Sequence, residues 1–167
     1  MENHILEQPE IVPINPTLQL KKYDGNCKLA LSWYQDETAL LMINGNPTPY
    51  GLPEIQAMYS YQSKVSELYF IEQQIDGAFT PVGDVSFSPE DITIMIAPDK
   101  QHQGIGTAVI QALIQRARSL HYPVLHVQEI YDFNTASQKL FTSLGFVREK
   151  KTALGHGYRL QLNYDKQ

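Results

Sequence analysis

The glycine pair in "DKQHQGIGTAV" (99–109) constrains the fold of this chain more than any other feature. Apolar residues recur every three or four positions after it, which predicts an amphipathic helix over 104–120. Each glycine costs roughly 1 kcal/mol in a helix relative to alanine. Two glycines in the first turn therefore indicate that these positions need a backbone conformation or a close approach that a side chain would prevent. A strand-like run, "DITIMIA", precedes the loop. Because N–H groups of a first helical turn lack partners and carry partial positive charge, this arrangement favours an anion site.

Two common phosphate-binding motifs do not fit this helix start. A P-loop needs a lysine and a hydroxyl directly after its last glycine, whereas threonine and alanine follow Gly106. The dinucleotide motif needs an earlier βαβ unit and a small residue where Val109 stands. A third pattern has glutamine or arginine, two residues, glycine, one residue, and glycine or alanine. Gln101, Gly104 and Gly106 match it without a gap.

A second motif lies one predicted helix and one predicted strand further on, in "NTASQKLFTSLGF" (134–146). The residues that fit it are Asn134, Ser137, Leu140, Phe141, Gly145 and Phe146. In this order and on these elements, the two motifs resemble the cofactor motifs of the GNAT acetyltransferase family. The specific resemblance covers about residues 80–150, and the N-terminal region is loosely similar to the aminoglycoside 6′- and ribosomal-protein N-acetyltransferase branches.

The remaining patterns predict a single α/β (α+β) domain over 1–167, with a mixed central sheet of about seven strands and about four flanking helices. Strands are expected within 14–24, 67–74, 81–88, 91–98, 123–131, 146–151 and 157–164, and helices within 27–43, 54–65, 104–120 and 134–144. Asp76-Gly77 is a strong hairpin signal between two of these strands.

Composition excludes several other classes. The net charge of −5 argues against nucleic acid as the main partner. Cys27 is the one cysteine, so an internal disulfide or a multi-thiolate metal site is not possible, and the histidines lack metal-ligand spacing; no metal is expected. No run of about 18 apolar residues is present, so no membrane span is expected. The first residues lack the pattern of a signal peptide, which predicts a cytoplasmic protein.

The resemblance implies acetyl-CoA as co-substrate and direct transfer of its acetyl group to an amine. It places the pantetheine along the strand edge at Ile94, Met95 and Ile96, with the N–H of Met95 or Ile96 polarising the thioester carbonyl. The other cofactor-binding positions are Gln101, His102, Gln103, Gly104, Ile105, Gly106, Thr107, Asn134, Ser137 and Phe141.

Direct transfer also needs a group that removes the proton of the amine, whose pKa is near 10. The acidic candidates are Glu129, favoured by its place on the strand after the long helix, together with Asp84 and Asp91. Many family members carry a tyrosine proton donor where this chain has Phe141, and Tyr131 is a possible replacement.

The acceptor site in this family is built largely by the N-terminal helices, here about 27–65. Trp33, Tyr34, Asp36 and Tyr50 offer aromatic faces and negative charge, which suit a cationic amine. We therefore expect a small-molecule primary amine, such as an aminoglycoside or a polyamine, and a monomer or homodimer. A protein N-terminus or lysine as acceptor, and a CoA-binding sensor without catalysis, remain alternatives.

Overall fold

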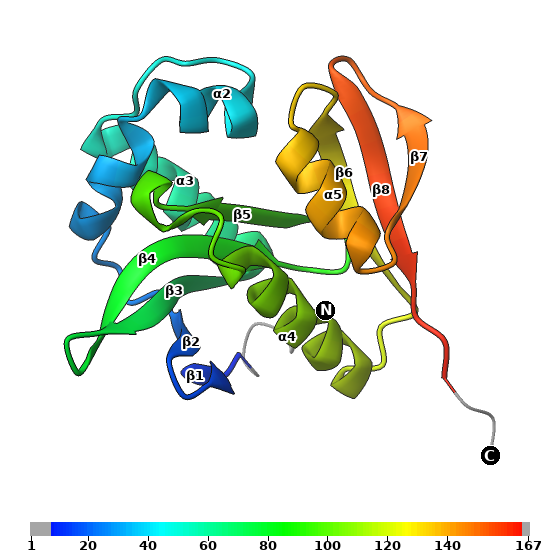
Figure 1. Ribbon diagram of the computed structural model, residues 1–167, viewed down its shortest axis with the longest axis horizontal. Coiled ribbons are helices and arrows are strands. Elements are labelled where there is room, and N and C mark those ends of the chain that lie inside the picture. The colour runs from blue at the N-terminus through cyan, green and yellow to red at the C-terminus, as the bar shows by residue number, and fades with distance from the viewer. Residues whose placement is uncertain (1–7, 165–167) are drawn as a thin grey trace.

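The computed structural model describes residues 8–164, which form a single α+β domain with eight strands in two sheets (Figure 1). The strands are β1 (Ile11–Asn15), β2 (Leu18–Lys22), β3 (Glu67–Ile75), β4 (Ala78–Phe87), β5 (Ile92–Ile96), β6 (Val124–Tyr131), β7 (Val147–Lys151) and β8 (Gly155–Gln161). The helices are η1 (Lys28–Tyr34), α2 (Glu37–Asn44), α3 (Leu52–Val65), η2 (Pro98–Lys100), α4 (Ile105–Ser119) and α5 (Thr135–Ser143). The expectation about a signal peptide falls partly on residues 1–7, which lie outside the described residues.

The segment predicted as one strand over 14–24 is a tight hairpin between β1 and β2. The Asn15 side chain accepts hydrogen bonds from the backbone N–H of Thr17 at 2.9 Å and from its hydroxyl at 3.1 Å. Pro16 stands between them. Since asparagine followed by proline favours turn initiation, the sequence carried the signal for this turn.

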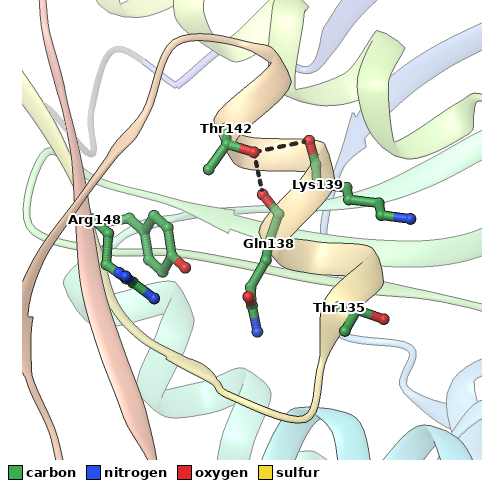
Figure 2. A pocket seen from close by; sticks show the side chains of 6 residues that line it. Thr135, Gln138, Lys139, Thr142 and Arg148 are labelled. Atoms are coloured by element: carbon green, nitrogen blue, oxygen red, sulfur yellow. Dashed lines mark hydrogen bonds between the residues drawn. The ribbon is translucent and has the colours of Figure 1, made fainter.

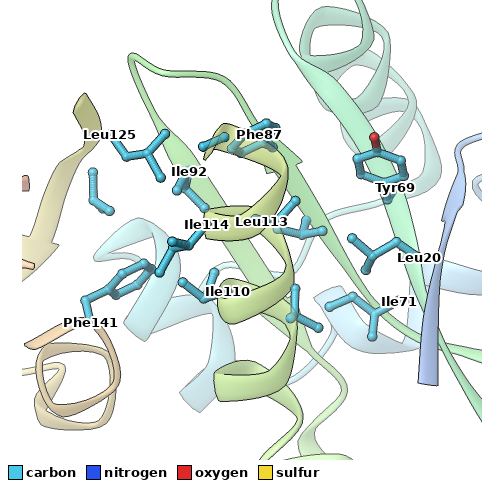
Figure 3. Packing of buried hydrophobic residues seen from close by; sticks show 14 of the residues in the cluster. Leu20, Tyr69, Ile71, Phe87, Ile92, Ile110, Leu113, Ile114, Leu125 and Phe141 are labelled. Carbon is cyan, nitrogen blue, oxygen red and sulfur yellow. The ribbon is translucent and has the colours of Figure 1, made fainter. Parts of the chain in front are cut away.

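The first sheet has the order β1-β2-β3-β4-β5, and α4 covers one of its faces. Figure 3 shows the apolar side of α4, with Ile110 and Leu113, packed toward Leu20, Ile71 and Phe87 of the strands. Burial of this apolar stripe explains why the three- and four-residue spacing after Gly104 forms a helix here.

The opposite face of this sheet packs on η1, α2 and α3. A second buried cluster unites Trp33, Leu40 and Tyr59 of these helices with Phe70 and Met95 of the sheet. The N-terminal helices are thereby fixed beside β5, which is the strand that carries the predicted thioester position.

The expected single mixed sheet is wrong: β6, β8 and β7 form a separate sheet, and all strand pairs in both sheets are antiparallel. The sheets meet where the N–H of His126 donates to the oxygen of Pro89 at 3.0 Å, and that of Gln128 to Asp91 Oδ1 at 2.9 Å. β6 then has a bulge between Val127 and Ile130. Of the described strands, only β4 pairs with β5, so the other edge of β5 is unpaired.

A buried ion pair fastens α4 to the first sheet. Arg116 donates two hydrogen bonds, both 2.7 Å long, to the carboxylate of Glu67, whose side chain is fully buried. Tyr69 also donates to Glu67. The pair holds α4 at a fixed depth on β3, which helps to position the first turn of that helix.

Two further properties concern residues 8–164. None of their helices combines the length and apolar character of a membrane span. Within the same range, no three side chains of His, Cys, Asp or Glu are grouped so that they could hold a metal ion.

Candidate active site

The start of α4 presents free backbone donors. Gly104 is the N-cap with φ +81°, and it has no side chain to accept the N–H groups of the first turn. His102 has φ +64°, so the loop contains two left-handed residues. Residues 101–104 are exposed. A Cβ added at Gly104 would meet no atom within 4 Å. An exposed loop that leads into uncapped N–H groups fits a pyrophosphate group.

The second glycine of the pair serves helix packing. A Cβ added at Gly106 would lie 3.2 Å from Leu140 Cδ2 of α5 and 3.5 Å from Ile96 Cδ1 of β5. Gly106 therefore lets α4 lie close to α5 and β5. The motif thus has one glycine for the backbone conformation and one for the close approach of three elements.

The unpaired edge of β5 presents defined backbone groups. The N–H of Ala97 donates to Val82 of β4 at 2.8 Å, and the register between β4 and β5 has no irregularity. In an antiparallel pair successive residues alternate in direction, so Met95 bonds to β4 while Ile94 and Ile96 face the open edge. The Gln101 side chain donates to the oxygen of Ile96 at 3.0 Å. Of the two predicted thioester donors, the alternation therefore favours the N–H of Ile96.

The second motif is mainly structural in its contacts. Asn134 caps α5 by accepting from the N–H of Ser137 at 3.1 Å, and its Nδ2 donates to the oxygen of Met42 in α2 at 3.3 Å. Phe141 is 2% exposed and packs edge-on against Phe146, with centroids 5.1 Å apart. The motif therefore seats α5 against α4 and ties it to the N-terminal helices.

Glu129, the favoured base in the sequence analysis, is engaged by the β7–β8 turn. Its Oε2 accepts hydrogen bonds from the Thr152 hydroxyl and from the N–H of Leu154, the latter at 3.2 Å. Asp91 instead connects the loop after β4 to β6 through Gln128. Both carboxylates thus hold together the elements around the open edge.

Tyr131 ends β6 among other aromatic rings. It stacks on the exposed Phe133, with ring centroids 5.2 Å apart. Burial, followed by the charges of Glu129 and Tyr50, raises the pKa of the Tyr131 hydroxyl above its ordinary value. The hydroxyl therefore keeps its proton at neutral pH and is able to donate it.

Asp84 lies in β4 directly opposite Met95, and its side chain is almost fully buried. The hydroxyls of Tyr34 in η1 and Tyr59 in α3 both donate to Asp84 Oδ2 at 2.6 Å. Burial raises the pKa of the Asp84 carboxyl to about 6, and the two hydrogen bonds oppose that rise. This cluster is the most perturbed acidic group near β5, and such groups are frequent at functional sites.

The predicted acceptor residues occupy different environments. Trp33 is buried, with its ring edge-on to Phe70 at 5.6 Å between centroids, so it is part of the core. The Asp36 side chain caps α2 by accepting from the N–H of Ala39 at 2.8 Å. Tyr50 is half-buried and stacks on Tyr34 with centroids 5.5 Å apart.

The connection between α2 and α3 touches the second sheet. A Cβ at Gly45 would lie 3.2 Å from Leu154 Cδ1 and 3.5 Å from Tyr131 Cζ. Together with the hydrogen bond from Asn134 to Met42 at 3.3 Å, these contacts connect the N-terminal helices to the end of β6 and to the β7–β8 turn. This contact was not predicted, since no local pattern encodes it.

A shallow hollow of about 330 Å³ lies away from this region, between α5 and the β7–β8 strands. Figure 2 shows Thr135, Gln138, Lys139 and Thr142 on this flank of α5, facing Arg148. A groove of about 900 Å³ runs between β1 and α4. Neither includes the β5 edge or the N-terminus of α4.

Comparisons with known proteins agree with this geometry. Residues 30–146 match the model of the acetyltransferase (GNAT) family. None of the curated protein sequences matches significantly. Many solved structures share the fold, and three of them are compared with this chain. The ribosomal L7/L12 α-N-protein acetyltransferase RimL, in complex with coenzyme A, has 21% identity and a TM-score of 0.76, covering 93% of this chain and 100% of that chain.

The second is YncA, a putative acetyltransferase from Salmonella typhimurium with acetyl-CoA, at 19% identity and TM-score 0.64, covering 90% of this chain and 96% of that chain. The third is a putative phosphinothricin N-acetyltransferase, at 19% identity and TM-score 0.71, covering 89% of this chain and 100% of that chain.

Proposed function

This chain belongs to the acetyltransferase (GNAT) family and is an acetyl-CoA-dependent transferase, and we propose that it acetylates a primary amine of a small cationic molecule. The observation that carries the choice of acceptor is the contact of the α2–α3 connection with Tyr131 and Leu154. A long peptide needs an open groove along the sheet, and this close approach places the α2–α3 connection beside the end of β6. The similar structures include a ribosomal-protein N-acetyltransferase and a putative phosphinothricin N-acetyltransferase, so family membership alone leaves the acceptor class open.

The side chains around this region favour a cation. Tyr50 and Tyr131 present aromatic rings that are partly accessible, and Phe133 is 43% exposed. Glu129 and Asp132 add negative charge on the same strand end. An ammonium group is attracted both by ring faces and by carboxylates, so a polyamine or an aminoglycoside fits these surroundings.

The proposed chemistry uses backbone groups first. The N–H groups at the start of α4 hold the pyrophosphate of acetyl-CoA, and Ile94 and Ile96 pair with the pantetheine amides as an added strand would. The N–H of Ile96 donates to the thioester carbonyl, where negative charge develops. Tyr131 donates a proton to the departing thiolate, which is the role left open by Phe141.

The test is acetyl-CoA turnover with a panel of acceptors, followed as release of free thiol. The panel contains polyamines, aminoglycosides, peptides with a free N-terminus and peptides with an internal lysine. We expect the highest kcat/KM with a small polycation. A higher kcat/KM with peptides would contradict the proposed acceptor class, and binding of CoA without thiol release for any amine would contradict catalysis.

A pair of tyrosine variants locates the acceptor. Tyr50→Ala removes a half-buried ring of the proposed site, while Tyr61→Ala removes a ring that is 66% exposed on α3. Loss of a cation–π contact of about 1–2 kcal/mol predicts a decrease in kcat/KM of about tenfold for Tyr50→Ala. Tyr61→Ala serves as the matched control and should leave kcat/KM unchanged.

A further inference from the structure

The carboxylates at the end of β6 are already engaged by other groups. Glu129 Oε2 accepts from Thr152 and from the N–H of Leu154. Asp132 Oδ1 lies 2.9 Å from His156 Nδ1. A cationic amine must nevertheless lose a proton before it can attack a thioester, because its lone pair is otherwise occupied. In contrast to both carboxylates, Asp84 of β4 is almost fully buried and lies opposite Met95 of β5.

We propose that Asp84 accepts this proton, while the hydroxyls of Tyr34 and Tyr59 hold one oxygen of its carboxylate. This inference rests on the proposed function, since it requires an amine acceptor beside the unpaired edge of β5. Asp84 is suitably placed because Met95, its partner in the register, directly precedes Ile96. Its side chain bonds to the helices that pack on the acceptor side of the sheet.

The two carboxylate oxygens of Asp84 differ in their hydrogen bonds. Both tyrosine hydroxyls end on Oδ2, each at 2.6 Å, and Oδ1 receives no hydrogen bond from the described residues. The two donors fix the orientation of the carboxylate. Oδ1 is thereby left for a proton that arrives through a water molecule.

The surroundings make this carboxylate a reasonable base at neutral pH. Burial is the largest influence on the Asp84 pKa and raises it to about 6, while the hydrogen bonds from Tyr34 and Tyr59 lower it. Tyr23 packs edge-on against Tyr59 with centroids 4.9 Å apart, and no cation of the described residues is among the influences. The charged form is penalised by burial, so Asp84 lowers folding stability when ionised.

The proposed reaction converts one ammonium group and one thioester into an amide, a thiol and one proton. The ammonium group of the acceptor gives one proton to Asp84 and becomes a neutral amine. Its lone pair then forms a bond to the carbonyl carbon of the thioester, and the carbon–sulfur bond breaks. The thiolate takes a proton from Tyr131, which is restored by the second proton lost from nitrogen. Asp84 releases its proton to solvent, which gives an amide, a free thiol and one proton.

The decisive experiment is the pH dependence of kcat/KM in two phenylalanine variants. Tyr59→Phe removes a hydrogen bond that favours the ionised carboxylate, so the acid limb, expected near pH 6 in the unmodified protein, should move upward by about one pH unit. Tyr69→Phe is the matched control: Tyr69 is equally buried and also donates to a buried carboxylate, Glu67, on the other face of the sheet. Its acid limb should stay in place. If the acid limb of kcat/KM lies at the same pH in Tyr59→Phe and Tyr69→Phe, the proposal is wrong.

Two substitutions of Asp84 complete the test. Asp84→Asn should lower kcat/KM by about 100-fold or more without lowering the thermal midpoint at neutral pH, and Asp84→Glu should restore part of the activity. Retention of activity in Asp84→Asn would refute a role in proton transfer. The profiles are measured with the best acceptor of the panel. If that acceptor is a peptide, the small-amine proposal fails while the acid limb of Tyr59→Phe still decides the role of Asp84.

Discussion

Removal of Arg116 should destabilise the protein far more than removal of an ordinary surface charge. Glu67 is fully buried and Arg116 is 15% exposed, with both hydrogen bonds at 2.7 Å. Taking away one partner of a buried pair costs about 3–5 kcal/mol because the other charge stays buried. Tyr69 continues to donate to Glu67 in Arg116→Met, so we expect the lower end, about 3 kcal/mol. For a domain of this size, that is a decrease in Tm of about 6–12 °C.

The assay is equilibrium urea unfolding of four proteins: the unmodified chain, Arg116→Met, Glu67→Gln and the double variant. The double variant should be more stable than Arg116→Met, because it no longer buries the Glu67 carboxylate without the guanidinium of Arg116. Since α4 carries the proposed pyrophosphate site, the affinity for CoA should decrease in Arg116→Met and recover in the double variant. A loss below about 1 kcal/mol in Arg116→Met, which is the range of an exposed pair, would refute the reasoning.

Two further substitutions separate structural from chemical roles near the end of β6. Glu129→Gln should lower kcat/KM by less than about tenfold, because it removes one of the charges that attract the amine. The amide of Leu154 should exchange hydrogen faster, because the Glu129 carboxylate accepts from that amide in the turn. A loss of about 100-fold would instead identify Glu129 as the base. Asn134→Ala removes the cap of α5 and the hydrogen bond to Met42, and should lower the free energy of unfolding by about 1 kcal/mol, measured by calorimetry. An unchanged Tm would contradict the capping role.

Local patterns predicted most of the elements in this chain. The three- and four-residue spacing after Gly104 predicted α4, and the three consecutive strands around Asp76-Gly77 are present as β3, β4 and β5. The β1–β2 turn was missed although Asn15-Pro16 signals it. The division into two sheets was not predictable in the same way, because it depends on pairing between strands that are far apart in the sequence.

In the candidate site too, the features encoded by local sequence were predicted and those that depend on long-range packing were not. The predicted position of the pyrophosphate depends on backbone geometry around Gly104, which glycine spacing encodes directly. The Asp84 cluster depends on Tyr34, 50 positions away, and on Tyr59, 25 positions away. With ten tyrosines in the chain, no single-sequence pattern selects these two. Partners brought together by the packing of η1 and α3 on β4 become visible only in the fold.

The most direct test of the central claim compares CoA binding to two glycine variants by calorimetry. Gly104 at the start of α4 and Gly77 in the β3–β4 hairpin have φ of +81° and +83°, and an added Cβ meets no atom within 4 Å at either position. Gly104→Glu and Gly77→Glu therefore impose the same backbone strain and charge. Only the first places a carboxylate before the free N–H groups of α4, so its affinity for CoA should decrease by about tenfold or more. Gly77→Glu should bind like the unmodified protein, and equal affinities in the two variants would contradict the assignment of the pyrophosphate to the start of α4.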